Sequence, residues 1–280
     1  MKGRSVAVEP RPFVYRPPVA EEIPVLVSIP HTGTLLPQDV SRDLASDEMR
    51  AGAMTDWHLD ALYSFLPELG IDVMHAVYHR FVIDLNRPPG ATPLYPGRFE
   101  TTLVPLETFQ GDPVYARPPS PQEIGRRIEL YHAPYHAALR RRLDEKIAKF
   151  GHCYLIDAHS VESRPSRLHG ALVDDVFLGD RDGTTCDPWF TDLIAGAFER
   201  RGLKVSRNAP YKGGYITAHY GDDDLTQGLQ IEMCQRLYMA EGSPQRAIDD
   251  PRFAAMQRLL RGVFGDLADA VLAGQCVRRL

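Results

Sequence analysis

The chain has 280 residues, of which 44% are hydrophobic and 25% charged, the composition of a globular protein with a sizeable core. Its formal net charge is −5 with acidic and basic residues interspersed, which excludes a nucleic-acid-binding or membrane-surface patch. No apolar run approaches the ~18 residues of a membrane-spanning helix, and the N-terminus has no signal-peptide pattern. Four widely spaced cysteines without a CxxC pair indicate reduced thiols, so we expect a cytoplasmic protein.

The first predicted elements are a strand and a helix. A Pro-rich N-terminal segment, about residues 1–22, precedes Val25–Ile29, a β-branched apolar run that is typical of a buried strand. Thr55 is a suitable N-cap for an amphipathic helix that runs to about Leu66.

Two extended segments and a long loop follow. Ile71–Tyr78 and Phe81–Leu85 are both predicted to be extended. Residues 87–119 hold eight prolines and few periodic apolar positions, so we expect a loop. Loops of this length are usually functional or disordered.

The second half of the chain predicts helices alternating with strands. Ser120-Pro121-Gln122-Glu123 matches a capping box, and the helix that it opens could reach Phe150 with a bend near Pro134. The remaining elements are the strand Cys153–Ile156, an apolar run at Ala171–Phe177, a helix opened by Asp187-Pro188 and closed by Arg200-Arg201-Gly202, short strands at Val205 and Leu229–Met233, and a helix at Arg252–Leu272.

This alternation predicts an α/β three-layer sandwich, with a mixed, largely parallel central sheet flanked by helices. No change in composition marks a domain boundary, so we expect a single domain over residues 1–280.

Ligands of such sheets bind beyond the carboxyl ends of the strands, so the residues at these ends are candidates for function. His31 follows the first strand, His159 follows Cys153–Ile156, and Asn86-Arg87 follow Phe81–Leu85. Glu232 lies within the apolar strand Leu229–Met233, where a carboxylate needs a partner or a role. Two histidines and a carboxylate form the ligand set of a catalytic zinc, and a further carboxylate can act as general base.

A purely structural interpretation of each residue remains open at this point. A lone histidine at a strand end is usually a hydrogen-bonded structural residue, Asp157 and His159 could form an ordinary polar pair, and Arg87 could lie on the surface. No HExxH motif is present to fix metal ligands by local spacing.

Six sequence blocks stand in order over residues 25 to 240. They are Val27-Ser28-Ile29-Pro30-His31-Thr32-Gly33, Thr55-Asp56-Trp57-His58, Arg80-Phe81-Val82-Ile83-Asp84-Leu85-Asn86-Arg87-Pro88, Asp157-Ala158-His159-Ser160, Tyr211-Lys212-Gly213-Gly214-Tyr215-Ile216-Thr217 and Leu229-Gln230-Ile231-Glu232-Met233. Together they resemble the N-formylglutamate amidohydrolase (deformylase) family, which is similar to the zinc carboxypeptidases, aspartoacylase and succinylglutamate desuccinylase. The resemblance implies a zinc carboxypeptidase-like fold and hydrolysis of N-formyl-L-glutamate to formate and glutamate, a step of histidine degradation.

The resemblance also implies roles for individual residues. His31 and His159 match the two metal histidines, and Glu232 matches the general base. Asn86 and Arg87 match a pair that grips a substrate carboxylate in the carboxypeptidase-like relatives.

The third metal ligand departs from the family pattern. The carboxypeptidase-like relatives have a carboxylate three residues after the first histidine, whereas this chain has Thr34. We therefore expect Asp56 to be the third ligand, because it would lie at the start of the helix predicted after Thr55, with His58 and Asp60 as alternatives. The expected cofactor is one Zn²⁺ per chain, although other divalent metals could bind.

Three further residues complete the expected site. Arg80 is a second candidate to stabilise the oxyanion. Lys212 and Gly214 could contact the substrate backbone or its second carboxylate, although glycines also permit tight turns for structural reasons alone.

The expected partner is a small N-acyl amino acid, and three alternative functions stay open. The chain could remove another acyl group from an acidic amino acid, or bind acidic metabolites without catalysis. A serine hydrolase using Ser160 with His159 is disfavoured, since no GxSxG motif occurs and adjacent strand residues point to opposite faces.

Overall fold

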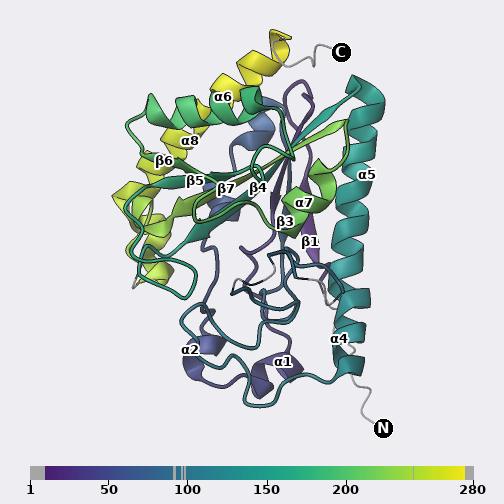
Figure 1. Ribbon diagram of the computed structural model, residues 1–280, viewed down its shortest axis with the longest axis vertical. Helices are drawn as coiled ribbons and strands as arrows, with labels where there is room; N and C mark the ends of the chain where they lie inside the picture. The colour runs from purple at the N-terminus through teal and green to yellow at the C-terminus, as the bar shows by residue number, and fades with distance from the viewer. Residues whose placement is uncertain (1–9, 91–92, 96, 98, 242, 275–280) are drawn as a thin grey trace.

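A central β-sheet organises the molecule (Figure 1). The computed structural model describes residues 10–274 except 91–92, 96, 98 and 242, and within them the sheet has seven strands in the order β1-β3-β2-β4-β7-β5-β6. The strands are β1 Phe13–Arg16, β2 Val25–Ile29, β3 Asp72–Ala76, β4 Cys153–Val161, β5 Val176–Gly179, β6 Val205–Arg207 and β7 Thr226–Cys234. Strands β3, β2, β4 and β7 are mutually parallel, whereas β1 and β5 run antiparallel to β3 and β7. The predicted mixed, largely parallel sheet is confirmed.

Helices cover both faces of this sheet, so the molecule has three layers. Helices α6 and α8 lie on one face, and α5 and α7 lie on the other (Figure 1). No helix in the described part of the chain is long and apolar enough to cross a membrane. The α-helices are α1 Gln38–Asp43, α2 Asp47–Arg50, α3 Leu59–Leu62, α4 Pro121–Arg127, α5 Ala133–Phe150, α6 Pro188–Glu199, α7 Tyr215–Gly221 and α8 Pro251–Leu272; shorter 3₁₀ turns are η1 Leu66–Leu69, η3 Gln235–Leu237 and η4 Pro244–Asp249, and η2 Ile128–His132 is a π-helical turn.

Strand β2 shows how a central strand packs against both helical layers. Val25, Val27 and Ile29 pack in the hydrophobic cluster beneath α6 and α8. Leu26, between them, packs in a second cluster beneath α5. Because successive side chains point to opposite faces and both faces are covered, four of the five residues are apolar, and the buried Ser28 hydroxyl pairs with the Tyr135 hydroxyl at 2.8 Å.

The capping box and the long helix are largely confirmed. The Ser120 hydroxyl accepts a hydrogen bond from the Glu123 backbone N–H at 3.2 Å, and helix follows to Phe150. The π-helical turn η2 interrupts it just before Pro134, a residue without an N–H to donate.

Two predictions in the first half are wrong. Thr55 does not cap a helix: its hydroxyl donates to the Gly52 carbonyl, and only the short α3 follows, after His58 with φ +59°. Phe81–Leu85 is a series of turns rather than a strand. Its buried apolar side chains, such as Val82 and Ile83, pack in the core beneath α5, which explains the strand-like pattern.

Two strands also extend beyond the predictions. β4 continues from Ile156 to Val161, so Asp157 and His159 lie within it. The Pro-rich N-terminal segment contributes the edge strand β1, which pairs with β3.

Candidate active site

A cavity of about 800 Å³ opens at the carboxyl ends of the parallel strands. It is lined by side chains from β4 and β7, from the loop after β2, and from segments of the long loop 87–119. Every residue nominated from the sequence lines this one cavity: His31, Asp56, Arg80, Asn86, Arg87, His159, Lys212, Gly214 and Glu232. The alternative ligands His58 and Asp60 are not among its lining residues, and Asp60 instead accepts a hydrogen bond from the Thr32 hydroxyl.

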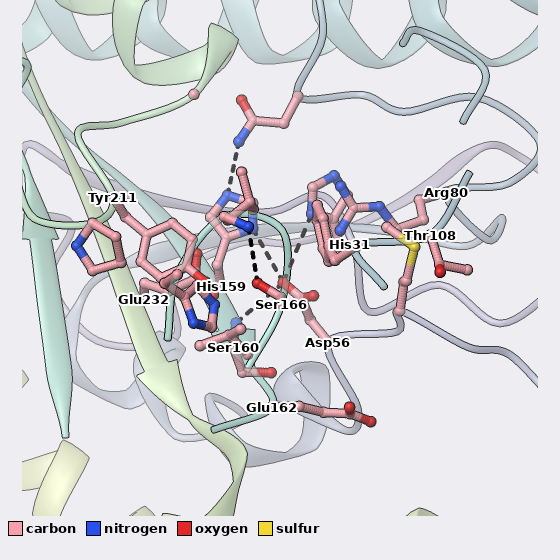
Figure 2. A pocket seen from close by; sticks show the side chains of 18 of the residues that line it. His31, Asp56, Arg80, Thr108, His159, Ser160, Glu162, Ser166, Tyr211 and Glu232 are labelled. Carbon is pink, nitrogen blue, oxygen red and sulfur yellow. Dashed lines mark hydrogen bonds and ion pairs between the residues drawn. The ribbon is translucent and has the colours of Figure 1, made fainter. Parts of the chain in front are cut away.

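Three buried residues form a group that could hold a metal ion. His31, Asp56 and His159 each offer one ligand atom, and these atoms lie within 4.8 Å of one another (Figure 2). Nδ1 of His159 is 3.1 Å from Asp56 Oδ2, and Nδ1 of His31 is 3.8 Å from the same oxygen. The Nδ1 atoms of both rings therefore face the Asp56 carboxylate.

The opposite nitrogen of each ring is held by a second carboxylate. His31 Nε2 is 2.6 Å from Asp84 Oδ1, and His159 Nε2 is 2.9 Å from Asp157 Oδ2. A carboxylate behind each histidine fixes the ring orientation and its tautomer, as is usual for metal-ligating imidazoles. The donor set of two imidazoles and one carboxylate therefore fits a catalytic divalent metal.

The two imidazoles have opposite electrostatic surroundings. Burial and the nearby Arg80 guanidinium lower the pKa of His31. Burial also acts to lower the pKa of His159, but Asp157 and Asp56 outweigh it and hold that pKa well above its usual range. Both ring nitrogens of His159 face carboxylate oxygens, and Asn86 Nδ2 also lies 2.9 Å from Nε2. A metal ion bound at Nδ1 would require that nitrogen to be unprotonated.

Glu232 lies next to the His31–Asp56–His159 group, on the neighbouring strand β7. It is directly opposite His159 in the β4–β7 register, and both side chains lie on the same face of the sheet. Burial is the main cause that raises the pKa of Glu232 to about 8. Its closest hydrogen-bond donor is the Gln230 side-chain amide, at 3.3 Å from Oε2. A buried carboxyl with a raised pKa next to a metal-type cluster is suited to exchanging protons.

Arg80 is a buried cation at the opposite side of the group. Its Nη2 donates to Asp84 Oδ2 at 2.6 Å, and its guanidinium lies 5.4 Å from the centre of the Phe109 ring. Within the described residues its Nε–H has no hydrogen-bond partner. One donor of a buried guanidinium thus remains for a ligand in the cavity.

Asn86 and Arg87 differ in what their side chains contact. Asn86 Nδ2 donates to Asp157 Oδ2 at 3.0 Å, and its Oδ1 accepts the Ile216 N–H at the start of α7. The Arg87 guanidinium donates to neutral oxygens only, the Asn86 carbonyl and the carbonyl and hydroxyl of Thr101. Burial is the first cause that lowers the Arg87 pKa. Asp84 and Glu100 act in the opposite direction, but the hydrogen bonds of the guanidinium in the described structure go to neutral oxygens, and donors remain for a substrate anion.

Lys212 and Gly214 occupy the rim formed by the chain before α7. Lys212 Nζ forms an ion pair with the exposed Asp182 at 2.6 Å. At Gly214 a Cβ atom would lie 2.3 Å from Asn86 Nδ2, and the Gly214 N–H donates to Gln230 Oε1. A side chain at position 214 would displace Asn86, which supports the structural interpretation of this glycine.

Three polar residues of the site were not nominated from the sequence. Asp84 and Asp157 hold the two histidines, and both stand within the blocks that carried the resemblance. Tyr211 lines the cavity, and its buried hydroxyl has no hydrogen-bond partner among the described residues. Burial and the nearby Glu232 raise its pKa. The aspartates could have been found by asking which carboxylates orient each histidine.

An α/β sandwich with a buried His–Asp–His group and an adjacent carboxyl in a strand-end cavity has the architecture of a hydrolase with a candidate metal site. A sequence model of the N-formylglutamate amidohydrolase family matches residues 23–239. The chain belongs to this family, as the sequence blocks predicted.

Individual relatives agree with this assignment. An N-formylglutamate deformylase from Pseudomonas putida is 39% identical over 248 residues, which cover 86% of this chain and 92% of the relative. One from Pseudomonas aeruginosa is 36% identical over 257 residues, covering 90% and 93%. The crystal structure of N-formylglutamate amidohydrolase from Ralstonia eutropha superposes with a TM-score of 0.79 at 33% identity, covering 94% of this chain and 99% of that one. A gene product of Agrobacterium tumefaciens shares the fold, with a TM-score of 0.67 at 20% identity over 95% and 96% of the two chains.

Proposed function

We propose that this chain is a zinc-dependent amidohydrolase that hydrolyses N-formyl-L-glutamate to formate and L-glutamate. The observation that carries the proposal is the buried group of His31, Asp56 and His159 beside the protonatable Glu232, in one cavity. The family membership supports the choice of substrate.

Two imidazoles and one carboxylate leave a coordination position open, as hydrolytic zinc sites require. We assign one zinc ion per chain to His31, Asp56 and His159, through the Nδ1 atoms that face Asp56. A metal ion held there would make water acidic enough to attack an amide at neutral pH. Asp84 and Asp157 would keep the two rings oriented.

The proton transfers are assigned to Glu232. Its carboxylate takes a proton from the attacking water and then delivers it to the leaving nitrogen, which becomes the amine of glutamate. A pKa of about 8 lets the same group hold and release a proton near neutral pH. Arg80 would direct its free Nε–H at the oxygen of the formyl group as negative charge develops there.

Substrate selection is assigned mainly to Arg87. A formyl group is too small to provide much binding energy, so recognition must come from the glutamate part and its two carboxylates. The Arg87 guanidinium has donors left after its bonds to Asn86 and Thr101, and a planar fork can hold one carboxylate through two hydrogen bonds. Lys212 is the candidate for the second carboxylate, in exchange for its surface partner Asp182. Asn86 supports this site through its bonds to Asp157 and α7.

Kinetics of Arg87→Lys test the substrate assignment. Lysine keeps the charge but loses the paired geometry, so kcat/KM for N-formyl-L-glutamate should fall by more than ~10-fold, while zinc content stays constant. The two formylated mono-amides of glutamate serve as controls, and the one that lacks the recognised carboxylate should be affected much less. Equal losses on all three substrates would show that Arg87 supports the fold or the transition state in general.

A panel of acyl groups tests the alternative deacylase functions. The zinc-loaded enzyme is assayed on formyl, acetyl and succinyl derivatives of glutamate and aspartate. Turnover that is highest with another derivative would replace the proposed substrate within the same chemistry. Binding without turnover by metal-loaded protein would instead indicate a binder of acidic metabolites.

A further inference from the structure

Asn86 and Arg87 line the cavity, and the segment Leu85–Arg87 that carries them does not belong to the sheet. A strand would satisfy its carbonyl groups through a ladder of backbone hydrogen bonds, and buried carbonyls without partners are costly. Partners for these carbonyls must therefore come from elsewhere. Two of them come from histidine side chains that none of the assigned roles uses.

His132 and His136 each hold one carbonyl of this segment. His136 Nε2 is 2.9 Å from the Leu85 carbonyl oxygen, and His132 Nε2 is 2.9 Å from the Arg87 carbonyl oxygen. His132 ends the π-helical turn and His136 lies four residues on, in the first turn of α5, so the two project from the same face, and their ring centres are 4.2 Å apart. Because a carbonyl oxygen only accepts, each ring must carry a proton on Nε2.

Tyr220 of α7 fixes the protonation of the second ring. Its hydroxyl lies 2.9 Å from His136 Nδ1, and the two rings are stacked with an interplanar angle of 10°. With Nε2 donating to Leu85, the Nδ1 atom of a neutral ring can only accept, so the Tyr220 hydroxyl shares its proton between this nitrogen and the His136 carbonyl oxygen, at 2.9 and 3.2 Å. Burial lowers the pKa of His136 to about 3 and also lowers that of His132. Both rings are therefore neutral, single-tautomer donors at neutral pH.

Helix α7 holds the middle of the same segment. Asn86 Oδ1 accepts the Ile216 N–H, and the Asn86 carbonyl accepts from Arg87 Nη1 and, at 3.4 Å, from the Tyr215 N–H. All three carbonyls of Leu85–Arg87 thus have partners, two of which are histidine rings from the helix behind the segment. The guanidinium position depends on the backbone that these rings hold.

We infer that His132 and His136 are positioning residues. Their hydrogen bonds to the Arg87 and Leu85 carbonyl oxygens, here called the clamp, set where the Arg87 guanidinium binds a substrate carboxylate. The mechanical part of this inference stands on geometry alone. Its catalytic consequence rests on the proposed function, because it assumes that Arg87 binds an acidic substrate. A shift of well under 1 Å at the fork is enough to weaken a two-bond contact with a carboxylate.

The test uses matched amide substitutions. Glutamine at 132 or 136 can place its amide near the position of Nε2, whereas asparagine is too short to reach the carbonyl. The variants are His132→Asn, His132→Gln, His136→Asn and His136→Gln, with His219→Gln as control. His219 belongs to the same aromatic cluster, stacked on Tyr215, but in the described structure forms no hydrogen bond to Leu85–Arg87.

Two readouts are measured on zinc-loaded enzyme. The first is the KM and kcat for N-formyl-L-glutamate and for the mono-amide that lacks the Arg87-bound carboxylate. The second is hydrogen exchange, by mass spectrometry, of the peptide that spans residues 81–88. Exchange reports on the clamp even if wild-type enzyme does not hydrolyse N-formyl-L-glutamate, a result that would reject the proposed function separately.

We expect each asparagine variant to raise KM for N-formyl-L-glutamate at least ~10-fold, the equivalent of one lost hydrogen bond, with kcat within ~3-fold. Its 81–88 peptide should exchange faster, and KM for the mono-amide should change little. Glutamine should restore both readouts, and His219→Gln should leave both unchanged. Unchanged exchange in the asparagine variants would overturn the clamp. Loss of kcat and KM alike on both substrates, without rescue by glutamine, would show that the histidines only pack the core.

Discussion

Two regions supply the cavity with polar side chains in different ways. Strands β4 and β7 deliver His159 and Glu232 from paired positions, so the sheet register alone fixes their separation. The segment 79–87 delivers Arg80 and Arg87 from turns, and individual side-chain hydrogen bonds hold it in place. Residues held by the backbone hydrogen bonds of the sheet should keep their positions when one supporting side chain is removed. A site built on turns should depend strongly on each support.

The largest expected effect is the loss of a metal ligand, which should not distinguish the two regions. His159→Ala in the strand and His31→Ala after β2 should each lose zinc and reduce kcat by ~1000-fold or more, since a bound metal contributes several kcal/mol to the transition state. Elemental analysis and activity are measured on the same samples. Either variant with full zinc and full turnover would remove that histidine from the ligand set.

Glu232→Gln tests whether Glu232, on strand β7, acts as a general base or as a metal ligand. Glutamine keeps the shape but cannot take the proton, so turnover should fall at least ~100-fold with zinc content near that of wild type. Because Glu232 must be ionised to act as a base, activity should also fall as the pH drops below its pKa of about 8, or below a lower value once a cation is bound nearby. Zinc loss in this variant would instead make Glu232 a ligand and cast doubt on Asp56.

The most direct comparison of the two regions replaces the carboxylates that contact the Nε2 atoms of His31 and His159. Asp84→Asn acts in the turn region and Asp157→Asn acts in β4. Asp84 also pairs with the buried Arg80, so its loss leaves a buried cation unpaired. We expect zinc affinity to fall by ~10–100-fold in Asp84→Asn and by less in Asp157→Asn. Competition with a metal chelator measures both, and equal losses would mean that the sheet gives no added support.

A pH effect on stability tests the helix side of the turn region. The pKa of His136 is about 3 in the folded chain, below its ordinary value near 6.5, so only the unfolded chain gains a proton at this site as the pH falls. The contribution of His136 to the free energy of unfolding is fully present above pH ~6.5 and is lost progressively towards pH 3. Between pH 7 and pH 5 this one group should cost about 2 kcal/mol, a loss that His136→Gln should lack. Urea unfolding at equal zinc content measures the difference, and identical pH slopes would contradict it.

The sequence predicted the strands that carry site residues better than it predicted the turns that carry them. Val25–Ile29 is nearly all apolar because both faces of its strand are covered. In Leu229–Met233, the apolar Ile231 and Met233 on either side make the carboxylate of Glu232 conspicuous. The resemblance then linked distant blocks that periodicity alone could not bring together.

The errors come from segments whose shape depends on distant contacts. Phe81–Leu85 has a strand-like pattern because it is buried, but burial does not specify strand pairing. The supports of this segment, His132 and His136, lie about 50 residues away and carry no local signal. Asp56 was nominated on a helix start that does not exist, yet its carboxylate faces both histidines.

The antiparallel direction of β5 has a consequence for how the chain can vary. Val161 at the end of β4 and Val176 at the start of β5 are opposite Cys234 and Met233 of β7, so residues 162–175 leave and re-enter the sheet at one edge, two strands apart. Strands are spaced about 4.8 Å apart, so this segment spans only ~10 Å between its ends. The entropy cost of closing a loop grows slowly with its length, by about 0.6 kcal/mol per doubling. Insertions here can reshape the wall that carries Arg167 and His169 without straining the sheet beneath.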